Sequence, residues 1–317
     1  MLTRILRVII FLLCLSKLGI VVAQQEPQFT QHMFNKLTYN PGYAGMRNAV
    51  CATGIMRQQW VGFVDMENNN IGPETYNFSI DSPIKFLHGG IGANIMQDKI
   101  GFFTQTNVDL GYSYHTTIGA GDLGIGLQAM FFNNVLDFSQ FDPINTDDPV
   151  LNQRTGEESD MIFDANFGVY YQVPNEFWFG ASAQNLFQST GKNTLFKLSR
   201  AVYVAGGYQL TFPTQPFIKI EPSIVIKTDF ASIQADINAM LKYRDRFWGG
   251  INYRFGDGLG FLFGLWYKDF KVGYSYDVST SKVSIGGSKG SHEIMLGYCF
   301  KFEFDRGIRT LRNTRYL

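Results

Sequence analysis

The chain has 317 residues with 27 basic and 27 acidic side chains, and it is rich in glycine (33), phenylalanine (29) and tyrosine (16). Balanced charge gives no basic surface for nucleic acid, and this much glycine with aromatic residues favours an exported β protein over a globular enzyme. No segment beyond the N-terminus approaches eighteen consecutive apolar residues, which excludes a membrane-spanning helix there.

The first 23 residues are typical of a secretory signal peptide. Arg4 and Arg7 precede a short apolar core, and small residues suited to cleavage follow, ending at Ala23. Ser16 and Lys17 interrupt the apolar run, which argues against a membrane anchor. We therefore expect an exported mature chain.

Residues 24–48 have neither a helical nor a strand period, and they are rich in aromatic and amide side chains. Asn40, Pro41 and Gly42 are predicted to make the turn into the first strand, because glycine tolerates backbone angles closed to other residues. The sequence thus predicts an irregular segment ahead of the regular structure.

From residue 49 onward the dominant period of apolar residues is two. In residues 232–244, six apolar side chains fall on one face and six hydrophilic ones on the other, which indicates a strand with one apolar and one wet side. Pro222 predicts a local defect, since proline cannot donate to a strand ladder. The predicted strands are 49–60, 74–82, 89–97, 103–117, 121–132, 160–172, 176–185, 199–211, 217–228, 231–243, 247–255, 258–267, 270–279 and 291–303.

Most of these strands are long enough to cross a membrane at a tilt, and about twice as long as the strands of a soluble β-sandwich. Mid-strand charges such as Lys219 and Asp236 need water on one side. We therefore predict an all-β protein, a transmembrane antiparallel β-barrel of about fourteen strands over residues 49–303. A short N-terminal periplasmic or plug segment (24–48) precedes it and a periplasmic tail (304–317) follows.

An even number of strands puts both chain ends on one side of the membrane. With both termini in the periplasm, the long connections become outer loops and the short ones inner turns. The long outer loops are then 61–73, 133–159, 186–198 and 280–290.

Five segments of the sequence resemble the PorP/SprF family. Pro-Gln-Phe-Thr-Gln-His-Met-Phe (27–34) and Asn-Pro-Gly-Tyr-Ala-Gly (40–45) are similar to its start, and Arg-Gln-Gln-Trp (57–60) to its first strand. Gly-Tyr-Ser-Tyr-Asp-Val (273–278) and Gly-Ser-His-Glu-Ile-Met-Leu-Gly-Tyr (290–298) are similar to its last strands. The order and spacing of these segments cover essentially the whole mature chain.

The resemblance implies an outer-membrane component of the type IX secretion system of Bacteroidetes, in some members tied to gliding motility. It implies export or surface attachment of secreted proteins through protein–protein contacts, with no enzyme activity and no cofactor. The implied partners are other type IX components in the outer membrane and periplasm, secreted surface proteins such as adhesins, and outer-membrane lipid, but not nucleic acid. A PorP-like core role and an SprF-like role for one adhesin both stay open.

The apolar residues of the N-terminal segment are the candidates for partner binding. Within a barrel protein they would pack on the lumen wall or on a periplasmic partner, and the sequence leaves both alternatives open. These residues are Phe29, Met33, Phe34, Leu37 and Tyr39.

Cys51 opens the first predicted strand and Cys299 lies in the last. Barrel closure makes these strands neighbours, strand parity points both side chains inward, and the compartment permits oxidation. The pair is therefore either a disulfide or two inert small residues.

The sequence offers little for metal or catalytic chemistry. Four histidines are scattered without metal-ligand spacing, and no nucleophile motif or phosphate loop is present. His292 and Glu293 are expected to join a polar network inside the barrel. Acidic runs at 65–70 and 142–148 are interpreted as solvated outer loops, although calcium loops have similar composition.

The alternative function is passive transport of small hydrophobic molecules across the outer membrane. Such channels also have about fourteen strands and an N-terminal plug, and Asn40-Pro41 fits either class. The polar loop at 154–160 does not favour capture of lipids.

Overall fold

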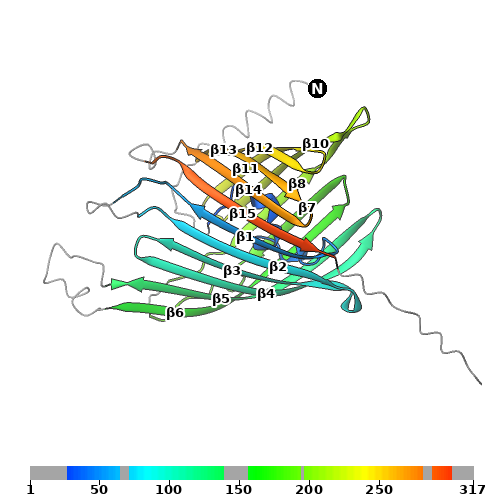
Figure 1. Cartoon of the computed structure of the whole chain (residues 1–317). Helices are drawn as coiled ribbons and strands as arrows, with labels where there is room; N and C mark the ends of the chain where they lie inside the picture. Colours follow the sequence, from blue (N-terminus) through cyan, green and yellow to red (C-terminus); the bar gives the residue numbers. More distant parts are fainter. Residues whose placement is uncertain (1–26, 65–70, 139–155, 194–195, 281–287, 302–317) are drawn as a thin grey trace, which may run out of the picture.

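The chain folds into a closed antiparallel β-barrel of fourteen strands (Figure 1). The structure is a computed structural model that describes residues 27–64, 71–138, 156–193, 196–280 and 288–301. The predicted signal peptide (1–23), the tail (304–317) and the acidic runs at 65–70 and 142–148 lie outside the described residues.

The strands follow one another around the barrel in chain order. Their bounds are β1 Val50–Gln58, β2 Glu74–Ile84, β3 Gly89–Ile100, β4 Phe103–Ile118, β5 Gly121–Asp137, β6 Glu157–Val173, β7 Phe177–Gln184, β8 Ala201–Tyr208, β9 Leu210–Phe212, β10 Gln215–Thr228, β11 Ile233–Tyr243, β12 Phe247–Arg254, β13 Gly258–Tyr267, β14 Phe270–Ser279 and β15 Ser291–Phe300. β8 and β9 are two parts of one barrel strand, because both pair with β10. The predicted fold class is confirmed.

The break between β8 and β9 lies opposite the proline that the sequence singled out. β10 pairs with β8 from Ser223 onward and with β9 up to Ile220, so Pro222 falls between the two registers. On the other side of this strand the ladder continues, because the backbone N–H of Gln209 donates to the carbonyl of Glu176, next to β7. The missing N–H of proline therefore coincides with the interrupted ladder.

Closure of the barrel depends on the pairing of the first strand with the last. β1 pairs with β15 over the whole length of β1, from Val50 opposite Phe300 to Gln58 opposite His292. The opposite side closes through β10 and β11. No described strand of the barrel is left without a neighbour on either side, as a strand in lipid requires.

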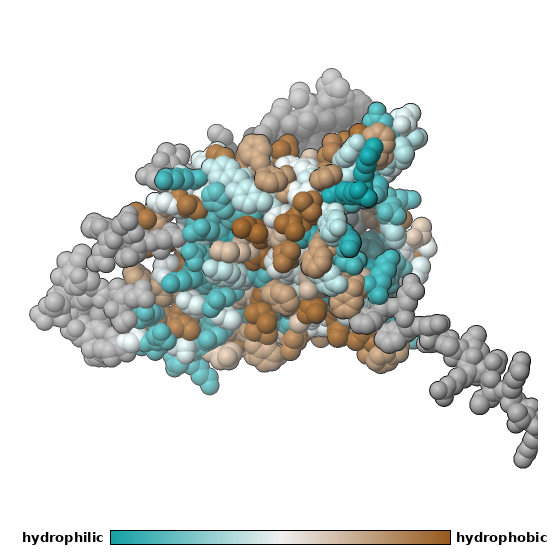
Figure 2. Space-filling view, in the orientation of Figure 1, coloured by the Kyte–Doolittle hydropathy of each residue, from teal (hydrophilic) through white to brown (hydrophobic). Residues whose placement is uncertain are grey.

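Side chains alternate between a lumen face and an outward face. Buried polar residues such as Asp109, Gln128 and Asn166 point inward from successive strands. Figure 2 shows apolar side chains gathered across the middle of the barrel's outer face, with hydrophilic ones toward the ends. The exposed apolar residues of the outward face include Phe78, Ile95, Leu110, Ile125, Leu127, Phe163, Phe179, Ile237, Leu241, Ile251, Phe263 and Leu296.

The two ends of the barrel differ in the length of their connections. One end, here the loop end, carries connections 59–73, 138–156, 185–200 and 280–290 together with three short ones. The other, the turn end, carries connections 85–88, 119–120, 174–176, 213–214, 244–246 and 268–269. The start of β1 and the end of β15 also lie at the turn end, as the even strand count requires.

In the described residues, the remaining regular structure consists of four short 3₁₀ helices. Three lie in the N-terminal segment, η1 His32–Phe34, η2 Lys36–Thr38 and η3 Pro41–Tyr43, and η4 Lys85–Leu87 lies in a turn. None of the helices in the described ranges is long or apolar enough to cross a membrane.

Leu127, in the middle of β5, tests which face contacts lipid. We expect Leu127→Arg to lower the free energy of unfolding by about 2–4 kcal/mol, because the bilayer centre does not solvate a guanidinium. Urea unfolding in phospholipid vesicles, followed by tryptophan fluorescence, measures it. Leu127→Phe is the matched control and is expected to unfold like the parent; equal stability of all three chains would contradict the assignment of this face.

Candidate functional site

The N-terminal segment runs through the lumen from the loop end to the turn end. Near its start, Thr30 contacts Glu293 close to the beginning of β15, at the loop end. Near its end, the carbonyl of Met46 accepts from Gln172 close to the end of β6, at the turn end. Nearly every described residue from Phe29 to Met46 is buried or half-buried. We call residues 27–49 the plug, since they occupy the barrel interior.

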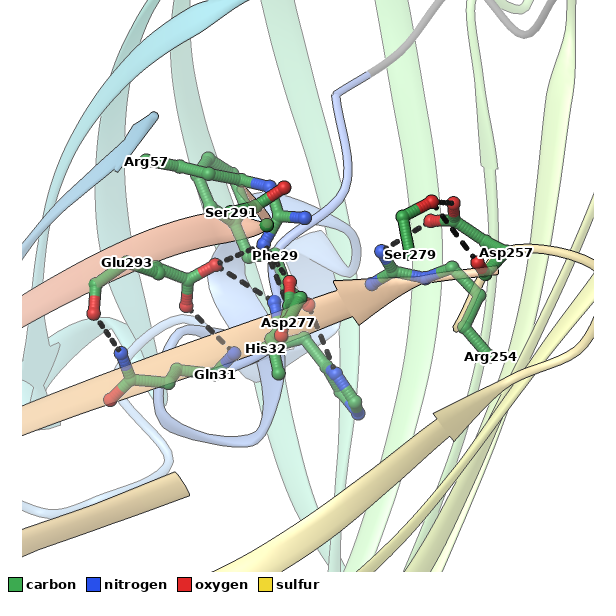
Figure 3. Close-up of polar contacts among 12 residues, drawn as sticks. Phe29, Gln31, His32, Arg57, Arg254, Asp257, Asp277, Ser279, Ser291 and Glu293 are labelled. Carbon is green, nitrogen blue, oxygen red and sulfur yellow. Dashed lines mark hydrogen bonds and ion pairs between the residues drawn. The ribbon is translucent and has the colours of Figure 1, made fainter. Parts of the chain in front are cut away.

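A network of charges inside the barrel holds the start of the plug (Figure 3). The backbone N–H groups of Thr30 and Gln31 donate to the two carboxylate oxygens of Glu293, at 2.9 and 2.8 Å. Arg57 lies 3.1 Å from Glu293 and 2.6 Å from Asp277, and the Thr30 hydroxyl donates to Asp277 at 2.6 Å. These buried charges are tolerated because each is paired and hydrogen-bonded.

A chain of hydrogen-bonded polar side chains, most of them amides, runs from the plug along the inner face of the barrel wall. The Asn35 side chain donates to Asn77 at 2.6 Å and accepts from Ser79 at 2.8 Å. Asn77 donates in turn to Asn94, and Asn94 to Asp109 on β4. The inward faces of three successive strands are thus connected to one plug residue by hydrogen bonds.

Lys36, in the middle of the plug, lies against aromatic rings of the barrel wall. Its ammonium group is 3.5 Å from the ring centre of Trp178 and donates to the Tyr170 hydroxyl at 2.9 Å. The plug lies inside the barrel and is not itself a membrane-spanning strand. Burial inside the barrel lowers the pKa of Lys36 well below its usual value. The ring face partly replaces the solvation that this cation loses.

Asn40, Pro41 and Gly42 dock on a patch of the wall made of glycines. Asn40 donates to the carbonyl of Val169 at 3.0 Å and accepts from the Gly42 N–H at 2.9 Å. A Cβ added to any of four wall glycines would lie within 2.6 Å of the plug's Asn40, Pro41 or Gly42, so only glycine admits so close an approach. These are Gly124 and Gly126 on β5, Gly168 on β6 and Gly180 on β7.

The end of the plug is fixed where it enters β1. Gly45, with a φ of +75°, donates to Asp81, which also pairs with Arg47. His115 contacts the carbonyl of Ala44 at 2.9 Å. The chain therefore turns into the first strand with its backbone groups bonded to the wall.

The structure places the five sequence candidates on the lumen wall or beside it. Phe29, Phe34, Leu37 and Tyr39 are buried and Met33 is half-buried. The Phe34 ring is 4.5 Å from that of Trp248, and Tyr39 stacks on Tyr203 at 5.9 Å. This arrangement is that of the lumen-wall alternative, and binding of a partner by these side chains stays a prediction.

The expectation that His292 and Glu293 both join a polar network inside the barrel is correct for Glu293 and wrong for His292. Glu293 points inward and holds the plug, but His292 lies on the opposite face, where it contacts the Tyr274 hydroxyl at 2.6 Å. Neighbours in a strand point to opposite faces, so sequence adjacency excludes the pairing. The inward parity of Arg57, Asp277 and Glu293 was the available signal for the network that the sequence reasoning missed.

The plug separates two chambers of the lumen. The outer chamber faces the loop end and is largely apolar; its lining includes Phe29, Tyr39, Met130, Phe132, Phe196 and Leu198. The inner chamber, with a volume of about 230 Å³, reaches the β6–β7 turn. Its lining includes Lys36, Trp178, Asn238, Lys242, Trp266 and Lys271.

A disulfide joins Cys51 and Cys299 in the structure. The two residues are direct partners in the β1–β15 register, near the turn end. The bond therefore links the first and last strands at the seam that closes the barrel.

Among the residues that the structure describes, no group of three or more His, Cys, Asp or Glu is arranged to hold a metal. The charged residues of the plug network are instead engaged with one another and with plug backbone.

Comparison with known families matches residues 21–298 to the family described as type IX secretion system membrane protein PorP/SprF. No curated protein matches the sequence. Among solved structures, the chain is similar to the CymD monoaromatic hydrocarbon channel, with 11% identity, 80% of this chain and 88% of that chain covered, and a TM-score of 0.51.

Two further structures are similar over most of the chain. The Ralstonia pickettii toluene transporter TbuX has 13% identity, covers 84% of this chain and 93% of its own, and gives a TM-score of 0.49. The KdgM porin has 10% identity, covers 80% and 100%, and gives 0.36. At these identities the likeness concerns the fold alone, that of an outer-membrane β-barrel.

The glycine patch generates a prediction about the plug. In Gly126→Ala the new methyl group would lie 2.3 Å from the Pro41 backbone, and overpacking of this kind costs about 1–3 kcal/mol. We expect amides 42–46 to exchange with deuterium about tenfold faster than in the parent, because the plug opens more often. The matched control is Gly54→Ala, where the nearest atom would be 3.9 Å away and exchange should not change. Equal protection in both variants would contradict close docking.

The seam disulfide generates a second prediction. We expect the Cys51→Ser/Cys299→Ser variant to be less stable than the parent by about 2–4 kcal/mol, because the bond restricts the unfolded chain. Thermal unfolding in detergent measures the difference, and dithiothreitol should lower the parent to the level of the variant without affecting the variant itself. Free thiols at both positions in the purified parent would show that the bond does not form.

Proposed function

Because the chain belongs to the PorP/SprF family of type IX secretion system membrane proteins, we propose that it supports export or surface attachment of secreted proteins. It acts as a binding component of the outer membrane, through protein–protein contacts and without catalysis. Its partners are other type IX components in the outer membrane and periplasm, and secreted surface proteins.

The observation that carries this proposal is the occupied lumen. The plug is anchored at its start by Glu293, in its middle by the glycine patch and at its end by Asp81. A polypeptide cannot pass through a barrel filled in this way, so the barrel contributes its surfaces and not a conduit. Contacts with other proteins then fall on the two ends and the outward face.

The proposal assigns different partners to the two ends. The turn end, where β15 ends, faces the periplasm and its machinery. The loop end, with the long connections, faces the exported protein or a neighbouring barrel. In this orientation the plug begins in the outward-facing part of the lumen and returns toward the periplasm.

A second candidate function is passive transport of small hydrophobic molecules. The apolar outer chamber favours it, with Phe29, Phe132, Phe196 and Leu198 in its lining, and CymD, of similar fold, is a monoaromatic hydrocarbon channel. The plug argues against it, because it lies between the outer and the inner chamber.

A crosslinked pull-down from isolated outer membranes tests the proposal. We expect the tagged protein to recover other type IX components or one large surface protein, and the identity of the captured proteins distinguishes a PorP-like from an SprF-like role. An unrelated tagged barrel from the same cells is the control. Recovery of the protein alone, together with toluene uptake into vesicles that contain it, would contradict the proposal and support the transporter.

A further inference from the structure

The inner chamber brings three lysines together from separate elements. Lys36 comes from the plug, Lys242 from β11 and Lys271 from β14, and all three line the same cavity. The Lys242 and Lys271 ammonium groups lie 5.0 and 5.5 Å from the centre of one ring, that of Trp266. Sequence spacing gives no sign of this cluster, which barrel closure and plug docking assemble.

The positive charge of this cluster is only partly balanced. Lys242 pairs with Glu221, and Glu176 lines the chamber from the exposed β6–β7 turn. Within the described ranges, neither Lys36 nor Lys271 has a carboxylate within ion-pair distance; Lys36 contacts Trp178 and the Tyr170 hydroxyl, and Lys271 lies on rings. Burial lowers the pKa of Lys36, and a carboxylate bound beside it favours its charged form. The chamber therefore offers excess positive charge to an anion in a confined, aromatic setting, where the electrostatic attraction is stronger than at an open surface.

An unpartnered amide lines the same chamber. Asn238, on the inward face of β11, is 1% exposed, and neither its side-chain nitrogen nor its oxygen has a hydrogen-bond partner. A buried amide without hydrogen-bond partners destabilises the folded chain, so such groups in native proteins usually bind a ligand or water. The Asn238 NH₂ group can donate to a carboxylate that the lysines attract.

We propose that the inner chamber binds a carboxylate of an acidic peptide segment that enters from the turn end. Lys36, Lys242 and Lys271 supply the positive charge, Asn238 donates a hydrogen bond, and Trp178 and Trp266 pack against the apolar part of the peptide. This inference rests on the proposed function, since it names the chemistry by which a protein partner is recognised.

The chain's own tail does not have the composition of this ligand. Residues 301–317 contain five basic side chains and two acidic ones, so their net charge is positive, like that of the chamber. The rings of Trp178 and Trp266 in the chamber lining also favour a peptide over a small inorganic anion. A small anion would leave the ring faces without a contact. An acidic segment of another protein fits both features.

Titration of purified, detergent-solubilised protein tests the inference. The probe is the tripeptide acetyl-Phe-Glu-Glu with a free carboxyl terminus. The readout is calorimetric heat together with intrinsic tryptophan fluorescence, to which Trp178 and Trp266 in the chamber contribute. We expect saturable binding that weakens with added NaCl, and no binding of acetyl-Phe-Gln-Gln-amide.

Variants locate the binding in the chamber. We expect Lys271→Gln and Asn238→Leu each to weaken the tripeptide at least tenfold. Lys219→Gln is the matched control, because Lys219 lies at the same end of the barrel but pairs with Asp245 and does not line the chamber. Near-UV circular dichroism and unchanged heat-modifiable mobility on gels verify that each variant is folded.

Three outcomes would overturn the inference: no saturable binding to folded protein, equal affinity of Lys271→Gln and parent, or competition by inorganic phosphate at the same concentration as the tripeptide. The last outcome identifies a plain anion site. The pull-down from membranes is independent of the titration, so captured secretion components without tripeptide binding would leave the proposed function standing and remove only this assignment.

Discussion

The structure depends on the closure of one sheet in a solvent that offers no hydrogen bonds. In lipid every backbone N–H and C=O of a strand needs a hydrogen-bond partner on a neighbouring strand. The pairing of β1 with β15 supplies these partners to the two strand edges that would otherwise stay open. Closure fixes which face meets lipid and which meets the lumen. It also brings Cys51 beside Cys299 and Arg57 beside Glu293, residues that lie at opposite ends of the sequence.

The plug solves a problem that closure creates. A barrel of this size encloses polar, inward-pointing side chains, and charges such as Arg57, Asp277 and Glu293 need partners there. Plug backbone N–H groups donate to Glu293, and the Thr30 hydroxyl donates to Asp277 and accepts from Arg57. The plug's aromatic side chains pack on inward aromatic rings such as Trp248 and Tyr203. The occupied lumen is the basis of the proposed role in protein contact, and the plug leaves the inner chamber as a small recess at the turn end.

The sequence predicted the strands well because their signal is local. Alternation over nine or more residues fixes both the strand and its two faces, and Pro222 correctly located the interruption between β8 and β9. The site was less predictable. Phe29, Phe34, Leu37 and Tyr39 could be recognised as apolar residues that need burial, but not assigned to a wall, and the wall glycines showed no local sign that a plug would lie on them.

By itself the sequence determined the barrel, its number of strands and the inward polarity, since period two and strand length depend only on near neighbours along the chain. Its five family-like segments also indicated the family. The tertiary structure decided what fills the lumen and which residues meet there. Glu293 holds Thr30 across 263 positions of sequence, and Lys36 shares a chamber with Lys242 and Lys271. Such contacts arise from closure and docking, which bring residues together through space and leave no period in the chain.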